Sequence, residues 1–211
     1  MGLTYACTCP RSARAGPHER AYPGTCRGGP ARHGPAALRF RIDDGATVRF
    51  EDRIQGRCEY RLEALGDVII RRRDGVPAYQ LAVVVDDAAQ SVTSVVRGAD
   101  LLASTGWQMA LGAALGLPPA SYAHLPLVVE RDGSKLAKSR HSVPLDPARP
   151  STWLARALEL LGQNPPTELT RGSPDRLLAW AVTHWSIERL RGIRTVHAPG
   201  QADLGPPPRM Y

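Results

Sequence analysis

The chain has 211 residues, 43% of them hydrophobic, and a formal net charge of +7. That much apolar material predicts a globular protein of one domain, or one domain with a small appendage, and excludes a largely disordered chain. The basic charge favours a polyanionic partner such as RNA or a nucleotide. Because no apolar run approaches the roughly 18 residues of a membrane helix, and no apolar signal core is present, we expect a cytoplasmic protein that does not bind membranes.

The N-terminal stretch, residues 1–37, is rich in Gly, Pro, Arg and Cys and has almost no hydrophobic periodicity. This composition predicts a loop-rich knuckle that needs a metal to order it. In a reducing cytosol, the cluster of Cys7, Cys9 and Cys26 indicates a metal site in preference to a disulfide. Cys7 and Cys9 can place two thiolates on one side of a tight turn, with Cys26 as a further zinc ligand. Cys58 stands apart and is expected to be a bystander thiol.

Spacing alone leaves the fourth ligand of this site open. Tyr22 lies four positions before Cys26, but a tyrosine oxygen is an unusual zinc ligand. His18 and His33 are the chemically ordinary candidates. Free cysteines without a metal are the remaining alternative.

The next elements expected along the chain are strands. Alternating apolar and polar residues over 37–50, interrupted by Asp43-Asp44-Gly45, predict a hairpin. Residues 67–72 predict a short strand that Asp74-Gly75 ends. The continuous apolar run at 81–85 is typical of a strand buried on both faces of a parallel sheet.

Two more strands are expected, at 94–96 and 125–129. Between them, Ser104 or Thr105 is expected to cap a helix that Gly116 closes. This alternation of strands and helices predicts an α/β nucleotide-binding sheet, in which ligands lie beyond the carboxyl ends of the strands.

The C-terminal part of the chain predicts a small helical appendage. An amphipathic helix begins near residues 151–152 and ends at Gly162, and a second is capped by Ser173 with Pro174 in its first turn. The tail over 193–211 is rich in Pro and Gly and is expected to be disordered.

The loop after the 125–129 strand carries Lys135 and Lys138, the only lysines in the chain. An ammonium on a flexible stem can follow phosphate oxygens as a bond to phosphorus breaks, so the pair suggests ATP chemistry. The alternative is a solvated turn with charged residues.

Four segments, at 79–87, 96–102, 124–127 and 135–139, together resemble the C-terminal half of the catalytic core of class I glutamyl-tRNA synthetases. Within that group, the pattern Cys7-x-Cys9 followed by Tyr22-x-x-x-Cys26 resembles the zinc knuckle of the glutamyl-Q tRNA(Asp) synthetases, which lack an anticodon-binding domain. The resemblance implies four segments: a zinc-knuckle and connective insert (1–66), the second half of a Rossmann-like core (67–148), a helical appendage (149–192) and the tail (193–211).

The same resemblance implies the reaction and its participants. ATP, with Mg²⁺, would activate L-glutamate to the adenylate, and the glutamyl group would pass to the queuosine of tRNA(Asp), on a monomeric enzyme. Tyr79 and Arg97 correspond to glutamate-binding residues, and Lys138, assisted by Lys135, to the contact with ATP phosphates. The implied zinc ligands are Cys7, Cys9, Tyr22 and Cys26. Without the resemblance, Tyr79 would be interpreted as a half-buried strand aromatic and Arg97 as a surface charge.

The chain departs from the family pattern at several places. Ala137 stands where the lysine signature usually has serine, and Ala88 where relatives commonly have histidine. We also expect the first half of the family's core, with its His-Ile-Gly-His-type ATP signature, to be missing before Cys7, which would leave this chain poorly active alone. The alternative function is a non-catalytic, zinc-containing RNA-binding module.

Overall fold

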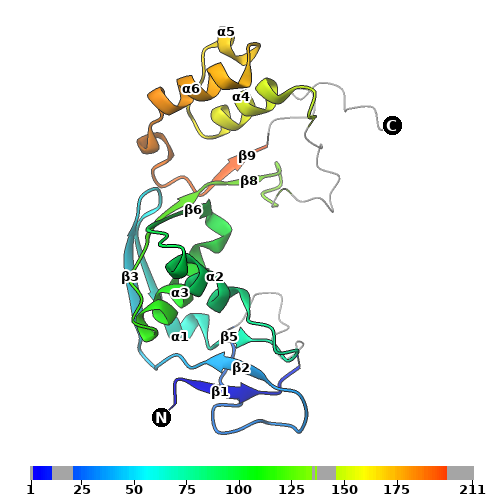
Figure 1. Cartoon of the computed structure of the whole chain (residues 1–211), viewed down its shortest axis with the longest axis vertical. Coiled ribbons are helices and arrows are strands. Elements are labelled where there is room, and N and C mark those ends of the chain that lie inside the picture. The colour runs from blue at the N-terminus through cyan, green and yellow to red at the C-terminus, as the bar shows by residue number, and fades with distance from the viewer. Residues whose placement is uncertain (1, 11–20, 135, 137–145, 199–211) are drawn as a thin grey trace, which may run out of the picture. The chain divides into compact units, whose positions relative to one another are not determined.

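The computed structural model describes residues 2–10, 21–134, 136 and 146–198 (Figure 1). The chain divides into two compact units, Met1–Asp52 with Arg57–Ala123, and Arg53–Gly56 with His124–Tyr211. The expectations placed on His18, Lys135, Ala137 and Lys138 fall outside the described residues. None of the helices within the described ranges is long and apolar enough to cross a membrane.

A three-stranded antiparallel sheet carries the N-terminal segment of the first unit. Its order is β1-β2-β5, with β1 at Thr4–Cys7, β2 at Ala37–Phe40 and β5 at Val68–Arg71. The strand expected at 67–72 is therefore confirmed. After it, Gly75 has a φ of +85°, which glycine adopts without a steric penalty, and the chain turns.

The first unit also contains most of a four-stranded sheet of order β4-β3-β7-β6. Its strands are β3 (Thr47–Asp52), β4 (Gly56–Arg61), β6 (Ser94–Gly98) and β7 (Ser121–Leu125), and β3 runs parallel to β7. The strand expected at 94–96 is confirmed as β6.

The hairpin expected over 37–50 is wrong, because β2 and β3 lie in different sheets. The turn at Asp43 does form, and Ala46 N–H donates to its carbonyl at 3.1 Å. Just before that turn, Ile42 is buried and its N–H donates to the Asp67 carboxylate at 2.8 Å, which holds the end of β2 beside β5. Alternation identifies a strand but not its partner, and here the partner is chosen by a contact 25 residues away.

The buried strand expected at 81–85 is also wrong, because these residues lie in helix α2 (Tyr79–Ala89). None of the residues of α2 is buried, and Val85 is exposed. Leu81 and Val84, three positions apart, face the core, so the apolar run serves one helix face. Packing against a neighbouring helix overrides the weak strand preference of valine.

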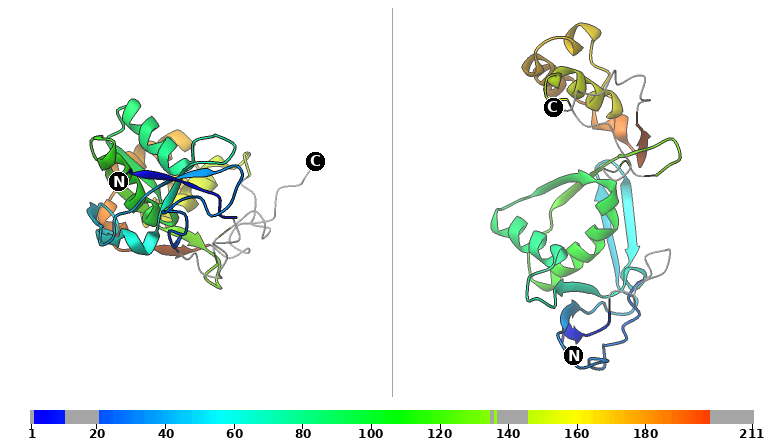
Figure 2. Two further views of the ribbon diagram at one scale, coloured as in Figure 1. Left: turned by 90° about the horizontal axis from the view of Figure 1, so that it is seen from below. Right: turned by 90° about the vertical axis from the view of Figure 1, so that its right-hand side faces the viewer.

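That neighbour is α3 (Leu102–Ala114), which packs side by side with α2 (Figure 2). It follows a 3₁₀ turn, Ala99–Leu101, so Ser104 and Thr105 lie inside the helix and do not cap it. Both are buried. The expected end at Gly116 is confirmed by its φ of +67°. Together with the short α1 (Leu62–Leu65), these elements enclose a core made by Phe40, Ile42, Leu62, Val68, Ile70 and Leu111.

In its described residues, the second unit combines a small parallel sheet with three α-helices and a 3₁₀ turn at Ile187–Leu190. β8 (Leu127–Val129) pairs with β9 (Thr195–His197), so the disorder expected from residue 193 onward is wrong for β9. The strand expected at 125–129 is split in two between Leu125 and Leu127, where Pro126 has no N–H to give to a ladder.

The helices of this unit are α4 (Pro150–Leu160), α5 (Thr167–Thr170) and α6 (Pro174–His184). Both expected helices are confirmed. Gly162, with a φ of +67°, follows α4, and the Ser173 hydroxyl accepts the N–H of Arg176 at 3.4 Å.

A loop from early in the chain completes the second unit. Ile54 is 1% exposed, and its carbonyl accepts the Gly192 N–H at 2.7 Å. Gln55 Nε2 donates to the carbonyls of His124 and Ile193 at 2.9 and 2.8 Å. The division into a zinc-knuckle insert, a second half-core, a helical appendage and a tail remains a prediction.

Candidate metal centre and substrate-binding residues

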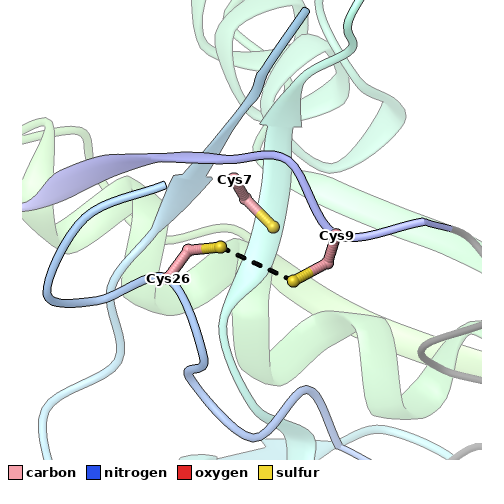
Figure 3. Close-up of side chains that lie close together, drawn as sticks. All are labelled: Cys7, Cys9 and Cys26. Carbon is pink, nitrogen blue, oxygen red and sulfur yellow. Dashed lines mark hydrogen bonds between the residues drawn. The ribbon is translucent and has the colours of Figure 1, made fainter. Parts of the chain in front are cut away.

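Three cysteine sulfurs converge at the end of β1 in the first unit. The Sγ atoms of Cys7, Cys9 and Cys26 all lie within 4.8 Å of one another, and Figure 3 shows the three side chains directed at a common point. Cys9 and Cys26 are 3.5 Å apart. Cys7 and Cys26 are buried. Cys58 is buried as well but does not belong to this cluster.

Tyr22 brings an oxygen to the same point. Its hydroxyl lies 3.4 Å from the sulfurs of both Cys7 and Cys9, and it accepts the backbone N–H of Cys26 at 3.0 Å. His33, the other described candidate for a fourth ligand, is exposed. The structure therefore gathers the three cysteines and the tyrosine that the sequence singled out.

This set fits a tetrahedral zinc ion. Zinc–sulfur bonds of about 2.3 Å place neighbouring sulfurs roughly 3.8 Å apart, which is within the spacing of the cluster. Four protein ligands, here three thiolates and one oxygen, are typical of a structural zinc site and not of a catalytic one.

Hydrogen bonds bias the cysteines unequally toward the thiolate. Burial raises the pKa of Cys7, but its hydrogen bonds with Tyr22 and Arg39 outweigh burial, and the pKa falls below its usual range. Burial also opposes ionisation of Cys26, yet Tyr22 and the backbone N–H groups of Ala31 and Thr8 lower its pKa to about 6. A hydrogen bond from Tyr22 favours the Cys9 thiolate, but burial and the neighbouring sulfurs raise its pKa. Two of the three ligands are thus predisposed to give up a proton to a metal.

A buried carboxylate holds the knuckle against the sheet. Asp67 is 2% exposed and accepts from Arg27 Nε and Nη2, both at 2.8 Å, and from the Tyr5 hydroxyl and the Ile42 N–H. Burial opposes the charge of Asp67, but these donors win and hold its pKa below its usual range. Its own carbonyl accepts Arg39 Nη1 at 2.6 Å.

A glycine lets the chain pass next to Tyr22. Gly66 has a φ of +71° and a ψ of 175°, a conformation nearly restricted to glycine. A Cβ at this position would lie 2.6 Å from the Tyr22 backbone nitrogen. The Gly66 carbonyl accepts the Trp107 indole N–H at 2.8 Å, which ties the knuckle to α3.

The predicted glutamate-binding residues lie elsewhere in the first unit. Arg97 lies near the end of β6, and its Nη2 donates to Thr105 Oγ1 at 2.8 Å. Its guanidinium carbon is 5.4 Å from the centre of the Tyr122 ring. Tyr79 is the first residue of α2 and is 52% exposed, so it is no strand aromatic. Asp86 and Asp87, directly after the apolar run at 81–85, lie on the same helix.

Sequence reasoning missed the residues that support these sites. Neither Arg39 nor Asp67 belongs to a spaced motif, although an arginine between Leu38 and Phe40 in a strand hints at a buried charge. Thr105 was assigned to a helix cap, but its hydroxyl orients Arg97.

Comparison with known proteins gives a consistent set of similarities. Residues 6–162 match the family model of the catalytic domain of class I tRNA synthetases (E and Q). The chain is 48% identical over 90% of its length to the glutamyl-Q tRNA(Asp) synthetase of Pseudomonas paraeruginosa, and 48% identical over 93% of its length to that of Ectopseudomonas mendocina. It spans 64% and 66% of those two proteins, which is just under two thirds.

A solved structure shows the same fold. A glutamate tRNA ligase from Elizabethkingia meningosepticum superposes with a TM-score of 0.63 over 80% of this chain and 37% of its own, at 21% identity. The α/β fold expected from the sequence is confirmed at this level.

Proposed function

Because the chain belongs to the family of class I tRNA synthetases (E and Q), we propose that it serves the ATP-dependent activation of L-glutamate and its transfer to the queuosine of tRNA(Asp). The resemblance to the catalytic core of class I synthetases is confirmed at the level of this family. The main support for this reaction is the 48% identity, over 90% of the chain, to a glutamyl-Q tRNA(Asp) synthetase. The proposal places the second half of a Rossmann-like core in residues 67–148, with the knuckle before it and the helical appendage after it.

Arg97 is proposed to bind the carboxylate of glutamate. A guanidinium can hold a carboxylate through two parallel hydrogen bonds, provided that its plane is held still. The Thr105 hydroxyl at 2.8 Å and the Tyr122 ring restrain that plane. Tyr79, with its hydroxyl on an exposed side chain at the start of α2, is proposed to orient the amino acid.

Lys138, assisted by Lys135, is proposed to contact the ATP phosphates and to stabilise negative charge as pyrophosphate leaves. Both lysines lie outside the described residues, so this role is supported by the sequence motif alone.

Cys7, Cys9, Tyr22 and Cys26 are proposed to hold zinc. Zinc would supply a cross-link between β1 and the segment around Cys26. The chain itself would hold the four ligand atoms close together before zinc binds. The Tyr22 hydroxyl is kept beside the sulfurs of Cys7 and Cys9 by these contacts and by the Cys26 N–H that it accepts.

ATP–pyrophosphate exchange dependent on L-glutamate tests the enzymatic proposal, followed by glutamylation of tRNA(Asp) with and without queuosine. In keeping with the poor activity expected of this chain alone, we expect weak exchange by the wild type, its loss in Arg97→Ala and a partial loss in Thr105→Val. Arg49→Ala is the matched control, because among the described residues the exposed Arg49 forms an ion pair with Glu59 alone. Binding of tRNA without any exchange would instead support the non-catalytic RNA-binding module.

A further inference from the structure

Arg39 is a buried cation at the metal centre. It is not one of the proposed zinc ligands, so its presence there needs a separate explanation. It lies in β2, directly opposite Tyr5 of β1, and is 3% exposed. Its guanidinium carbon lies 3.6 Å above the centre of the Tyr22 ring. The guanidinium therefore covers one side of the cluster formed by Cys7, Cys9, Tyr22 and Cys26.

Apart from the Cys7 sulfur, which is neutral as a thiol, the hydrogen bonds of Arg39 leave its charge uncompensated. Nη1 donates to the Asp67 carbonyl, a neutral acceptor, and Nε has no hydrogen-bond partner among the described residues. The nearby Asp67 carboxylate is occupied by Arg27, Tyr5 and Ile42. Within the described part of the chain, Arg39 pairs with no carboxylate. A buried cation without a counter-charge is costly.

The metal site offers the missing counter-charge. Three thiolates around a divalent ion leave one unit of negative charge, and more if the tyrosine binds as a phenolate. This excess lies beside the Arg39 guanidinium in a region with little water to screen it. The cation and the metal–thiolate cluster therefore stabilise each other.

We infer that Arg39 is a positioning residue of the metal centre: its positive charge raises the affinity of the Cys7, Cys9, Tyr22 and Cys26 site for zinc and holds the Tyr22 ring by stacking on its face. The inference rests on the metal site proposed above. This role goes beyond packing. An apolar side chain in this place of β2 could fill the space but would bring no charge to the metal centre.

Three variants separate charge from packing. Arg39→Met keeps the length of the stem and removes the charge, and Arg39→Lys keeps a charge. Arg73→Met is the matched control, because the exposed Arg73 donates to the Thr8 and Cys9 carbonyls of the same knuckle. Zinc dissociation constants are measured by competition with a chromophoric chelator, and folding is checked by circular dichroism.

Removing an outer partner of a metal ligand typically weakens metal binding about 10- to 100-fold. We expect a loss in that range for Arg39→Met, a loss under about tenfold for Arg39→Lys and almost none for Arg73→Met. With Co²⁺ in place of zinc, the sulfur-to-metal charge-transfer band should move to longer wavelength in Arg39→Met. A thiolate that has lost a neighbouring cation gives up an electron more easily, and Arg39→Lys should restore the band.

Equal zinc affinity and equal Co²⁺ spectra for wild type and Arg39→Met would overturn the inference while leaving the metal site in place. Failure of the wild type to bind zinc or Co²⁺ would overturn both. If Arg39→Met does not fold, Arg39→Lys decides: a loss of affinity above about 100-fold with a shifted band, despite its charge, would contradict the electrostatic role.

Discussion

Asp67→Asn tests the buried carboxylate that joins the knuckle to the sheet. Asparagine has the same shape but turns one acceptor oxygen into an N–H donor facing Arg27 or Tyr5, and it removes the charge. Breaking a buried ion pair by removing one partner costs about 3–5 kcal/mol. Because the Arg27 side chain is 27% exposed and keeps Asp44 as a second partner, we reduce this to about 2–3 kcal/mol.

The assay is urea unfolding of the metal-free protein, followed by a signal from the first unit. With an m value of about 2 kcal/mol/M, the midpoint should fall by roughly 1–1.5 M. Asp44→Asn is the control, because it removes the same charge from the same arginine at a side chain that is 85% exposed. Its midpoint should equal that of the wild type within error. Equal shifts for the two variants would refute the argument from burial.

Acidification gives an independent check on Asp67. Its pKa in the folded protein lies below the value of 3.8 expected when unfolded. The stability contributed by the carboxylate is therefore complete above about pH 4 and is lost as the pH falls through the folded pKa. The difference in unfolding free energy between wild type and Asp67→Asn should be constant from pH 5 to about 7 and shrink below pH 4. A difference that grows on acidification would contradict this sign.

Three further predictions concern the knuckle and the second unit. Gly66→Ala should lower the free energy of unfolding by about 2–4 kcal/mol and weaken zinc binding, because backbone strain and a clash with the backbone of Tyr22 add up. Gly75→Ala, at a φ of +85° with open space around the Cβ, should show the effect of strain alone in the same denaturation assay. Cys26→Ser should lower the zinc content measured by elemental analysis and abolish the destabilisation caused by a chelator, while Cys58→Ser should keep the metal; equal zinc in both would exclude Cys26 as a ligand. Gln163→Leu should cost about 2–4 kcal/mol and speed hydrogen exchange at the ends of α4 and α6, since the buried amide makes three hydrogen bonds to backbone groups there; unchanged exchange would contradict this role.

Features encoded by neighbouring residues could be predicted from the sequence. Ser173 and Pro174 start α6 and Gly162 follows α4 as expected, because caps and left-handed glycines act within one turn of a helix. The convergence of Cys7 and Cys26 could be predicted as well, since a thiol cluster is evident from composition and its pattern matched a known knuckle.

Features that depend on distant packing could not be predicted. The apolar run at 81–85 is compatible with a buried strand and with one face of a helix, and packing against α3 and β5 decides between them. The role of Arg39 depends on a tyrosine 17 residues earlier in the chain and on a carbonyl 28 residues later, and no local pattern announces either contact.

The loop of Arg53–Gly56 has a consequence for how this protein folds. The Gln55 side chain donates to the Ile193 carbonyl across 138 residues, and the buried Ile54 belongs to the same compact unit as residues that are synthesised much later. Closing so long a loop lowers the entropy of the chain before the stabilising contacts form. We therefore expect it among the slow, late steps of folding. During synthesis the second unit cannot reach its final hydrogen bonding until Gly192 has left the ribosome, and a fragment starting at His124 would lack the Ile54 side chain and carbonyl that complete it.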